Sequence, residues 1–237
     1  MLSLPSRSPL IATALAAVLL AGPPALVRAP DRHGIALDTV ALAPVAIPEE
    51  LPDSSRAQAA FEVLLTAELR SLGATVVPAR TAGATWQRLL DSVGGFYSAY
   101  TGEVDDAKYH AVFDGTLHEL HARFGADALL RARIGVVTVN WRSGNAKWDG
   151  TSEGIGGGAS GTLPALTLFV ELDDPNGNVV YTGRGGIQVM MKTSLLHRDQ
   201  LHDLDPTKLL TDEGRNRNAV RLALDSLGPV LTRSRSP

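Results

Sequence analysis

Residues 163–189 read LPALTLFVELDDPNGNVVYTGRGGIQV, and this stretch decides the fold. Four apolar side chains of its first half fall on one face of an extended chain: Leu166, Leu168, Val170 and Leu172. The next six residues, 173–178, are Asp, Pro, Asn and Gly, which favour a reversal of the chain. Residues 179–189 resume an apolar, extended pattern. The stretch therefore predicts an antiparallel hairpin.

A third strand is predicted immediately before this hairpin, over residues 128–141 (ALLRARIGVVTVNW). Apolar and charged residues alternate along its first half, with Arg131 and Arg133 on one face. The opposite face carries Leu130, Ala132, Ile134 and Val136. A strand with this alternation is half-buried, and it completes the centre of a sheet.

The elements before and after this centre add helices and a parallel pair of strands. Residues 35–47 and 74–78 predict two strands joined by a helix, which suits a parallel crossover. Further apolar stripes predict the helices 54–72, 81–93, 105–124 and 212–231. The expected fold is α/β (α+β): a single mixed sheet of about five strands with an antiparallel hairpin core, and helices packed mainly on one face.

The N-terminal 29 residues resemble a secretory signal peptide. Arg7 precedes an apolar run over residues 10–21, and small residues lead to candidate cleavage points after Ala25 or Ala29. The run is shorter than the ~20 residues that a membrane-spanning helix needs. We therefore expect a signal peptide (1–29), a linker (30–34), one α/β domain (35–231) and a disordered tail (232–237), with no spanning segment in the mature chain.

The composition narrows the functional classes. Of 237 residues, 22 are Lys or Arg and 25 are Asp or Glu, which gives a net charge of −3, and aromatic residues make up 5%. A basic surface or stacking platform for nucleic acid is therefore not expected. The chain has no cysteine, which excludes disulfides and a lipidated N-terminal cysteine. A periplasmic or secreted location is predicted.

The segment 142–161 is rich in glycine and serine and predicts a long flexible loop between two strands. Trp141 and Trp148 flank or lie in this loop. Tryptophan is enriched at binding hot spots, so both residues are candidate contacts for a partner protein. The alternative is that they cover the edge of the sheet while the loop stays unused.

A row of polar side chains on the predicted helix 105–124 is a candidate metal site. The row consists of His110, Asp114, His118 and His121. Imidazole and carboxylate groups suit Zn²⁺, but one helix supplies only neighbouring pairs, so ligands such as His197 or His202 would also be needed. The alternative is a half-exposed boundary beside the apolar stripe. No catalytic residues and no cofactor are predicted, because no triad or phosphate-binding motif is present.

Several short motifs together resemble a group of bacterial envelope proteins. The motifs are Ala43-Pro44 after the first strand, Leu69, Leu72 and Gly73 at a helix end, Pro78, residues 125–128 (GADA), and Tyr181-Thr182-Gly183. Together they resemble the periplasmic α/β domains of curli-secretion lipoproteins, lipoprotein activators of penicillin-binding proteins, and the N-terminal domain of the Tol-system β-propeller protein. The resemblance covers roughly residues 35–230.

The resemblance implies an exported, non-enzymatic cell-envelope accessory protein that acts by protein–protein binding. Its partner would be an envelope protein that the sequence does not identify, and self-association into a homo-oligomer is a further expectation. Two alternatives remain open at this point. One is a periplasmic metal-binding protein that uses the histidine-bearing helix, and the other is a hydrolase with an unrecognised active site.

Overall fold

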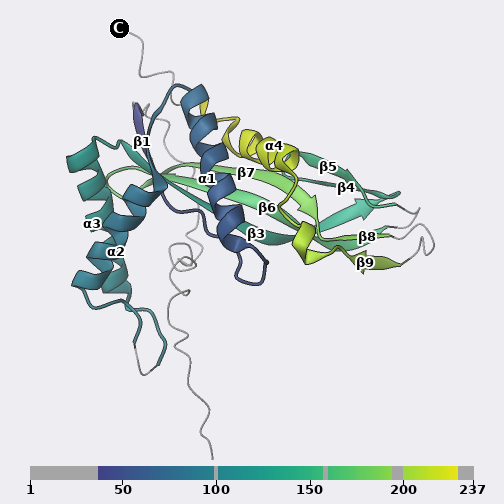
Figure 1. Ribbon diagram of the computed structural model, residues 1–237, viewed down its shortest axis with the longest axis horizontal. Helices are drawn as coiled ribbons and strands as arrows, with labels where there is room; N and C mark the ends of the chain where they lie inside the picture. The colour runs from purple at the N-terminus through teal and green to yellow at the C-terminus, as the bar shows by residue number, and fades with distance from the viewer. Residues whose placement is uncertain (1–36, 99–100, 157–159, 194–199, 229–237) are drawn as a thin grey trace, which may run out of the picture.

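The computed structural model describes residues 37–98, 101–156, 160–193 and 200–228. The expected signal peptide, linker and C-terminal tail, and His197 of the proposed metal ligands, lie outside these residues. Within the described residues the chain is a mixed α/β structure with four α-helices (Figure 1). The helices are α1 (Ser54–Ser71), α2 (Ala79–Ser92), α3 (Asp106–Phe124) and α4 (Glu213–Leu224), and a 3-10 turn, η2, spans Pro206–Lys208.

The main sheet has seven strands among the described residues. These are β1 (Thr39–Leu42), β2 (Thr75–Val77), β3 (Ala128–Arg142), β4 (Asn145–Trp148), β5 (Thr151–Gly154), β6 (Gly161–Asp173) and β7 (Val179–Val189). A separate two-stranded sheet contains β8 (Met191–Thr193) and β9 (Leu201–Asp203). The mixed α/β class is confirmed, but the expectation of a single sheet of about five strands is wrong, because β4 and β5 of the main sheet and the separate pair β8 and β9 were not expected.

The long antiparallel pairing of β3 with β6 forms the centre of the main sheet. It runs from Leu129 opposite Asp173 to Trp141 opposite Gly161. On the far side of β6, β7 continues the antiparallel order, as residues 163–189 predict. At the other side, β1 lies between β2 and β3 and is parallel to both. The predicted crossover between parallel strands is therefore confirmed.

The turn between β6 and β7 forms for the reason that its sequence suggests. The Oδ1 atom of Asp174 accepts hydrogen bonds from the backbone N–H groups of Asn176 and Asn178, at 2.8 and 2.9 Å. Gly177 adopts a φ of 79°, which glycine reaches without a steric penalty. This explains the carboxylate of Asp174 as a turn former.

The helices cover both faces of the sheet, so the expectation that they pack mainly on one face is wrong. On one face, α1 and α4 pack against β3, β6 and β7 through a core that includes Phe61, Leu65, Val220 and Leu168. On the opposite face, α2 and α3 pack against β1 and β2 through a core around Trp86. Figure 1 shows α2 and α3 gathered at one end of the molecule. This arrangement leaves the rest of the second face to other elements.

The segment 142–161 is not a simple loop, which corrects the expectation from its composition. Residues 145–154 form the hairpin β4–β5, with Trp148 paired opposite Thr151. The N–H of Gly186 on β7 donates to the carbonyl oxygen of Asp149 at 3.0 Å, which ties the hairpin to the main sheet. Glycine-rich composition failed as a predictor here because the hairpin's partners lie far along the chain.

None of the helices in the described residues has the length and apolar content needed to cross a membrane.

Candidate functional site

The second face of the sheet has an open region between two covered ends. One end is covered by α2 and α3. The other end is covered by the β4–β5 hairpin, which packs on the sheet through a small core around Ile155. Between them, β3, β6 and β7 present partly exposed side chains. Because these strands are paired in register, side chains from three strands line up across the region.

A row of three such side chains crosses the open region. Arg133 of β3 is the pairing partner of Phe169 of β6, which is in turn the partner of Arg184 of β7. The Cζ atom of Arg133 lies 4.0 Å from the centroid of the Phe169 ring, and the Cζ atom of Arg184 lies 5.0 Å from it. Both guanidinium groups therefore make cation–π contacts with one ring. We call these residues the Arg–Phe–Arg row.

The positive charge of the row is not balanced by acids in the described part of the chain. The ion pairs found there include neither Arg133 nor Arg184. Arg184 is exposed, while Arg133 and Phe169 are half-buried. A guanidinium that stacks on an aromatic ring keeps its N–H edge free for carboxylate or phosphate oxygens.

A glycine beside the row makes room for it. A Cβ atom on Gly135 would lie 2.9 Å from a guanidinium nitrogen of Arg133 and 3.1 Å from Cε2 of Phe169. Both distances are shorter than ordinary van der Waals contact, so a side chain at this position would displace the arginine or the ring. Gly135 thus leaves room for the guanidinium of Arg133 and the ring of Phe169 beside the strand.

The neighbouring arginine on the same strand is different, because its charge is neutralised. Arg131 donates two hydrogen bonds to Asp173, at 2.6 and 2.8 Å, and pairs with Glu171 at 2.9 Å. The Asp173 side chain is 1% exposed, and burial raises its pKa although Arg131 opposes that shift. Arg131 is therefore engaged in ion pairs with acids of the same fold, whereas the Arg–Phe–Arg row remains available to a ligand at the surface.

The two tryptophans expected to contact a partner are buried in the structure. Trp141 and Trp148 are 5% and 9% exposed, and both belong to the core beneath the β4–β5 hairpin. The indole N–H of Trp148 lies 3.4 Å from the carbonyl oxygen of Leu166, while that of Trp141 has no hydrogen-bond partner among the described residues. Their contact with a partner stays a prediction, and the structure shows a packing role.

The polar row on α3 lies along the exposed side of that helix, as its spacing predicts. His110, Asp114, His118 and His121 are all exposed. The Nδ1 atom of His121 lies 2.9 Å from the carbonyl oxygen of Ala126, at the end of the helix. Among the residues that the structure describes, no group of three or more His, Asp or Glu side chains is placed to hold a metal ion.

Sequence reasoning missed the Arg–Phe–Arg row. It placed Arg131 and Arg133 together on the polar face of a strand, but it could not distinguish the paired arginine from the unpaired one. Phe169 and Arg184 belong to strands whose register with β3 is a tertiary feature. The available signal was the recurrence of arginine on the exposed faces of both β3 and β7.

The described residues thus form a mixed α/β structure with an open sheet face that carries the Arg–Phe–Arg row. The sequence of the chain matches no protein-family model and no curated protein. Several solved structures are similar to the chain at low TM-scores. One is lipoprotein GNA1162 from Neisseria meningitidis, with 20% identity, a TM-score of 0.33, and coverage of 63% of this chain and 81% of that one.

Two further solved structures are similar to a comparable degree. The PelC dodecamer from Paraburkholderia phytofirmans has 16% identity and a TM-score of 0.34, with coverage of 84% of this chain and 91% of that one. The LpoB C-terminal domain from Salmonella enterica has 15% identity and a TM-score of 0.31, with coverage of 66% and 87%. The expected resemblance to envelope lipoproteins is confirmed. Because these TM-scores are low, function is inferred from the chain's own residues.

Proposed function

We propose that this protein is an exported, non-enzymatic accessory protein of the cell envelope that acts by binding another protein. We further propose that the Arg–Phe–Arg row binds an acidic segment of that partner. The supporting observation is that two guanidinium groups flank one aromatic ring on an open sheet face. Neither group forms an ion pair with an acid among the residues that the structure describes. Arginine and aromatic residues are the types most enriched at the centres of protein interfaces.

The geometry favours carboxylates as the complementary groups. Each guanidinium is held by the Phe169 ring, so less side-chain freedom is lost when it binds. Charge-assisted hydrogen bonds from arginine to a carboxylate are short and often bidentate. Two of them on neighbouring strands suit a segment that carries two or more Asp or Glu residues. Such contacts govern specificity and association rate, and they weaken as the salt concentration rises.

The proposal is tested with a defined probe and a matched control. The probe is a fluorescent ten-residue peptide rich in glutamate, and the same peptide with glutamine in place of glutamate controls for charge. The test variant is the double substitution Arg133→Gln/Arg184→Gln. The control variant is Arg70→Gln/Arg80→Gln, which removes the same charge from exposed arginines at the other side of the fold.

We expect the wild-type chain to bind the glutamate peptide with an affinity that falls with added salt. Arg133→Gln/Arg184→Gln should weaken binding by about tenfold or more, while the control variant should change it by less than about threefold. Capture of an envelope protein from native extracts should follow the same order of variants. Equal binding by the two double variants, or equal binding of the two peptides, would overturn the assignment of the row.

A further inference from the structure

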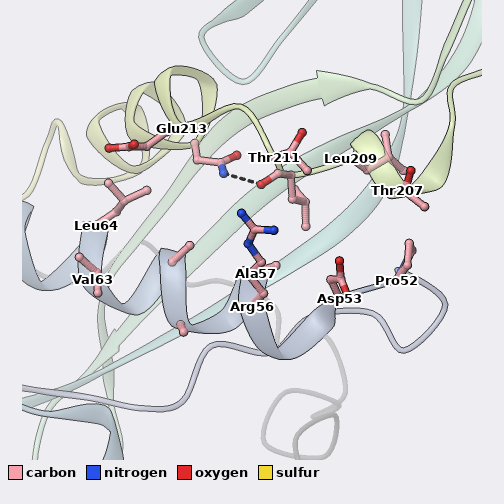
Figure 2. Close-up of a pocket in the computed structure, with 14 residues that line it drawn as sticks. Pro52, Asp53, Arg56, Ala57, Val63, Leu64, Thr207, Leu209, Thr211 and Glu213 are labelled. Carbon is pink, nitrogen blue, oxygen red and sulfur yellow. Dashed lines mark hydrogen bonds between the residues drawn. The ribbon is translucent and has the colours of Figure 1, made fainter.

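A second site lies on the other side of the sheet, between α1 and α4. A cavity of about 490 Å³ opens there, within the range of small-molecule sites. It is lined by the first half of α1, by the segment around η2, and by the start of α4 (Figure 2). Its walls are largely apolar and include Ala60, Val63, Leu64 and Leu209. A few polar groups among them have no hydrogen-bond or ion-pair partner in the described part of the chain.

The first of these polar groups is a cation. Arg56 projects from α1, and Figure 2 shows its guanidinium directed toward the segment that carries Leu209 and Thr211. The ion pairs of the described residues do not include it. Two acids, Asp53 and Glu213, line the cavity, and Glu213 forms an ion pair with Arg217. Arg56 therefore offers up to five N–H donors to whatever enters the cavity.

The second group is a buried acceptor without a donor. Asn216 lines the cavity and is 3% exposed. Its Nδ2 atom donates to the carbonyl oxygen of Leu210 at 2.8 Å, the bond drawn as a dashed line in Figure 2. That bond orients the amide, and its Oδ1 atom has no hydrogen-bond partner among the described residues. A buried acceptor left unpaired costs about 1–3 kcal/mol, so a donor from a ligand would be favoured here.

The third group is an acid in an unusual backbone conformation. Asp53 precedes α1 with a φ of 57° and a ψ of 33°, and its carboxylate does not cap the helix. Leu210, also in the cavity wall, has a φ of 61°. Left-handed conformations are costly for residues other than glycine and gather at binding sites. The carboxylate of Asp53, like Arg56, has no ion-pair partner among the described residues.

We propose that this cavity binds a small zwitterionic molecule with an apolar side chain, which is the chemistry of an amino acid or a short peptide. Its carboxylate pairs with Arg56, its ammonium group pairs with Asp53, and an N–H group of the ligand donates to Asn216 Oδ1. Its side chains pack against Val63 and Leu64. Arg56 matches the carboxylate, Asp53 and Asn216 Oδ1 match the N–H donors, and the apolar walls match the side chains. An anion alone would leave Asp53 and Asn216 unsatisfied.

This site is separate from the Arg–Phe–Arg row. The cavity is built by the helices that pack on the first face of the sheet, whereas the row lies on the second face. Loss of acidic-peptide binding at the row is therefore not expected to remove ligand binding in the cavity, or the reverse. A single preparation of each variant can be tested for both.

The test measures binding of leucyl-leucine by calorimetry and by amide chemical shifts of the labelled full chain. Two analogues probe the ends of the ligand: N-acetyl-leucyl-leucine lacks the ammonium group, and leucyl-leucine amide lacks the carboxylate. The variants are Arg56→Gln and Asp53→Asn, both at exposed positions where folding should be preserved. Arg70→Gln, on the same helix but outside this cavity, is the control.

The expected result is a crossed pattern of losses. Arg56→Gln and removal of the ligand carboxylate should each weaken binding by about tenfold, and the two together should weaken it little further. Asp53→Asn and acetylation of the ligand should behave in the same way, and Arg70→Gln should bind like wild type. Shift changes should centre on residues 53–64 and 207–216. No saturable binding in the millimolar range, or additive losses within each pair, would overturn the proposal.

Discussion

Gly185 of β7 lies so close to α4 that a Cβ atom on it would be 1.9 Å from the carbonyl oxygen of Ala219. Gly183, two residues earlier on the same face of the strand, has the same relationship to the carbonyl oxygen of Ala223. Since the obstructing atoms are backbone, no rotamer change can relieve the clash. Gly185→Ala should therefore destabilise the protein by about 1–3 kcal/mol or more, measured by urea unfolding.

The matched control for this substitution is Gly154→Ala on β5. A Cβ atom there would meet nothing within 4 Å. The free energy of unfolding should change by less than about 0.5 kcal/mol. If Gly185→Ala proved as mild as Gly154→Ala, the close packing of α4 on β7 would be incorrect.

The buried pair of Arg131 and Asp173 predicts a large effect from the loss of one partner. Arg131→Met keeps the length of the side chain but leaves Asp173, 1% exposed, without its cation. We expect a loss of about 3–5 kcal/mol in the free energy of unfolding. Arg123→Met breaks an exposed pair with Glu119, in which the arginine is 62% exposed, and should cost no more than about 0.5 kcal/mol. Equal losses in the two variants would contradict the burial of the pair.

The main elements of the fold were predictable because their signals are local. The turn of residues 173–178, the alternation in β3 and β6, and the apolar stripes of the helices are all readable within a few residues of sequence. Capping was less regular, since Asp105 accepts from the N–H of Lys108 at the start of α3, whereas Asp53 makes no side-chain cap at the start of α1. The division of the helices between the two faces could not be predicted, because the apolar stripe of a helix does not indicate which face of the sheet it packs against.

The β4–β5 hairpin and both candidate sites depend on contacts between distant parts of the chain. Trp148 lies in a segment whose composition indicates a loop, yet it is buried against strands that begin more than ten residues later. Arg133, Phe169 and Arg184 meet only through strand register. Asn216 is an ordinary polar residue of a helix in the sequence, and only the structure shows that its Oδ1 atom is buried without a donor among the described residues. A sequence pattern records none of these distances.

Tyr181 predicts a loss of stability at high pH. Its hydroxyl donates to the carbonyl oxygen of Ala223 at 2.7 Å, and burial raises its pKa from 10.0 to about 12. A raised pKa means that this contribution is complete below pH 10, where tyrosine is neutral in both states, and is lost as the pH rises toward 12. Tyr181→Phe should cost about 0.5–1.5 kcal/mol at pH 7 through the lost hydrogen bond. The difference in melting temperature between wild type and variant should shrink above pH 10, and a constant difference would contradict this account.

Glu153 makes the opposite prediction, at low pH. Burial would raise its pKa, but hydrogen bonds from Lys192, from the N–H of Val189 and from Arg215 lower it below 4.5 overall. Since a lowered pKa favours the charged form in the folded state, its contribution is present above pH 4.5 and is lost as the pH falls through the folded-state pKa. Glu153→Gln should therefore destabilise the protein by about 1–3 kcal/mol at pH 7, because a buried acceptor of two cations is replaced by a neutral amide.

This prediction is measured by urea unfolding of both proteins from about pH 3 to about pH 7, a range that brackets the ordinary pKa of glutamate. The two free energies of unfolding should converge at the acid end of the range. Glu213→Gln, which removes an exposed carboxylate, is the control and should follow the wild-type curve. A gap between wild type and Glu153→Gln that stayed constant down to pH 3 would show that the carboxylate charge is not what joins β5, β8 and α4.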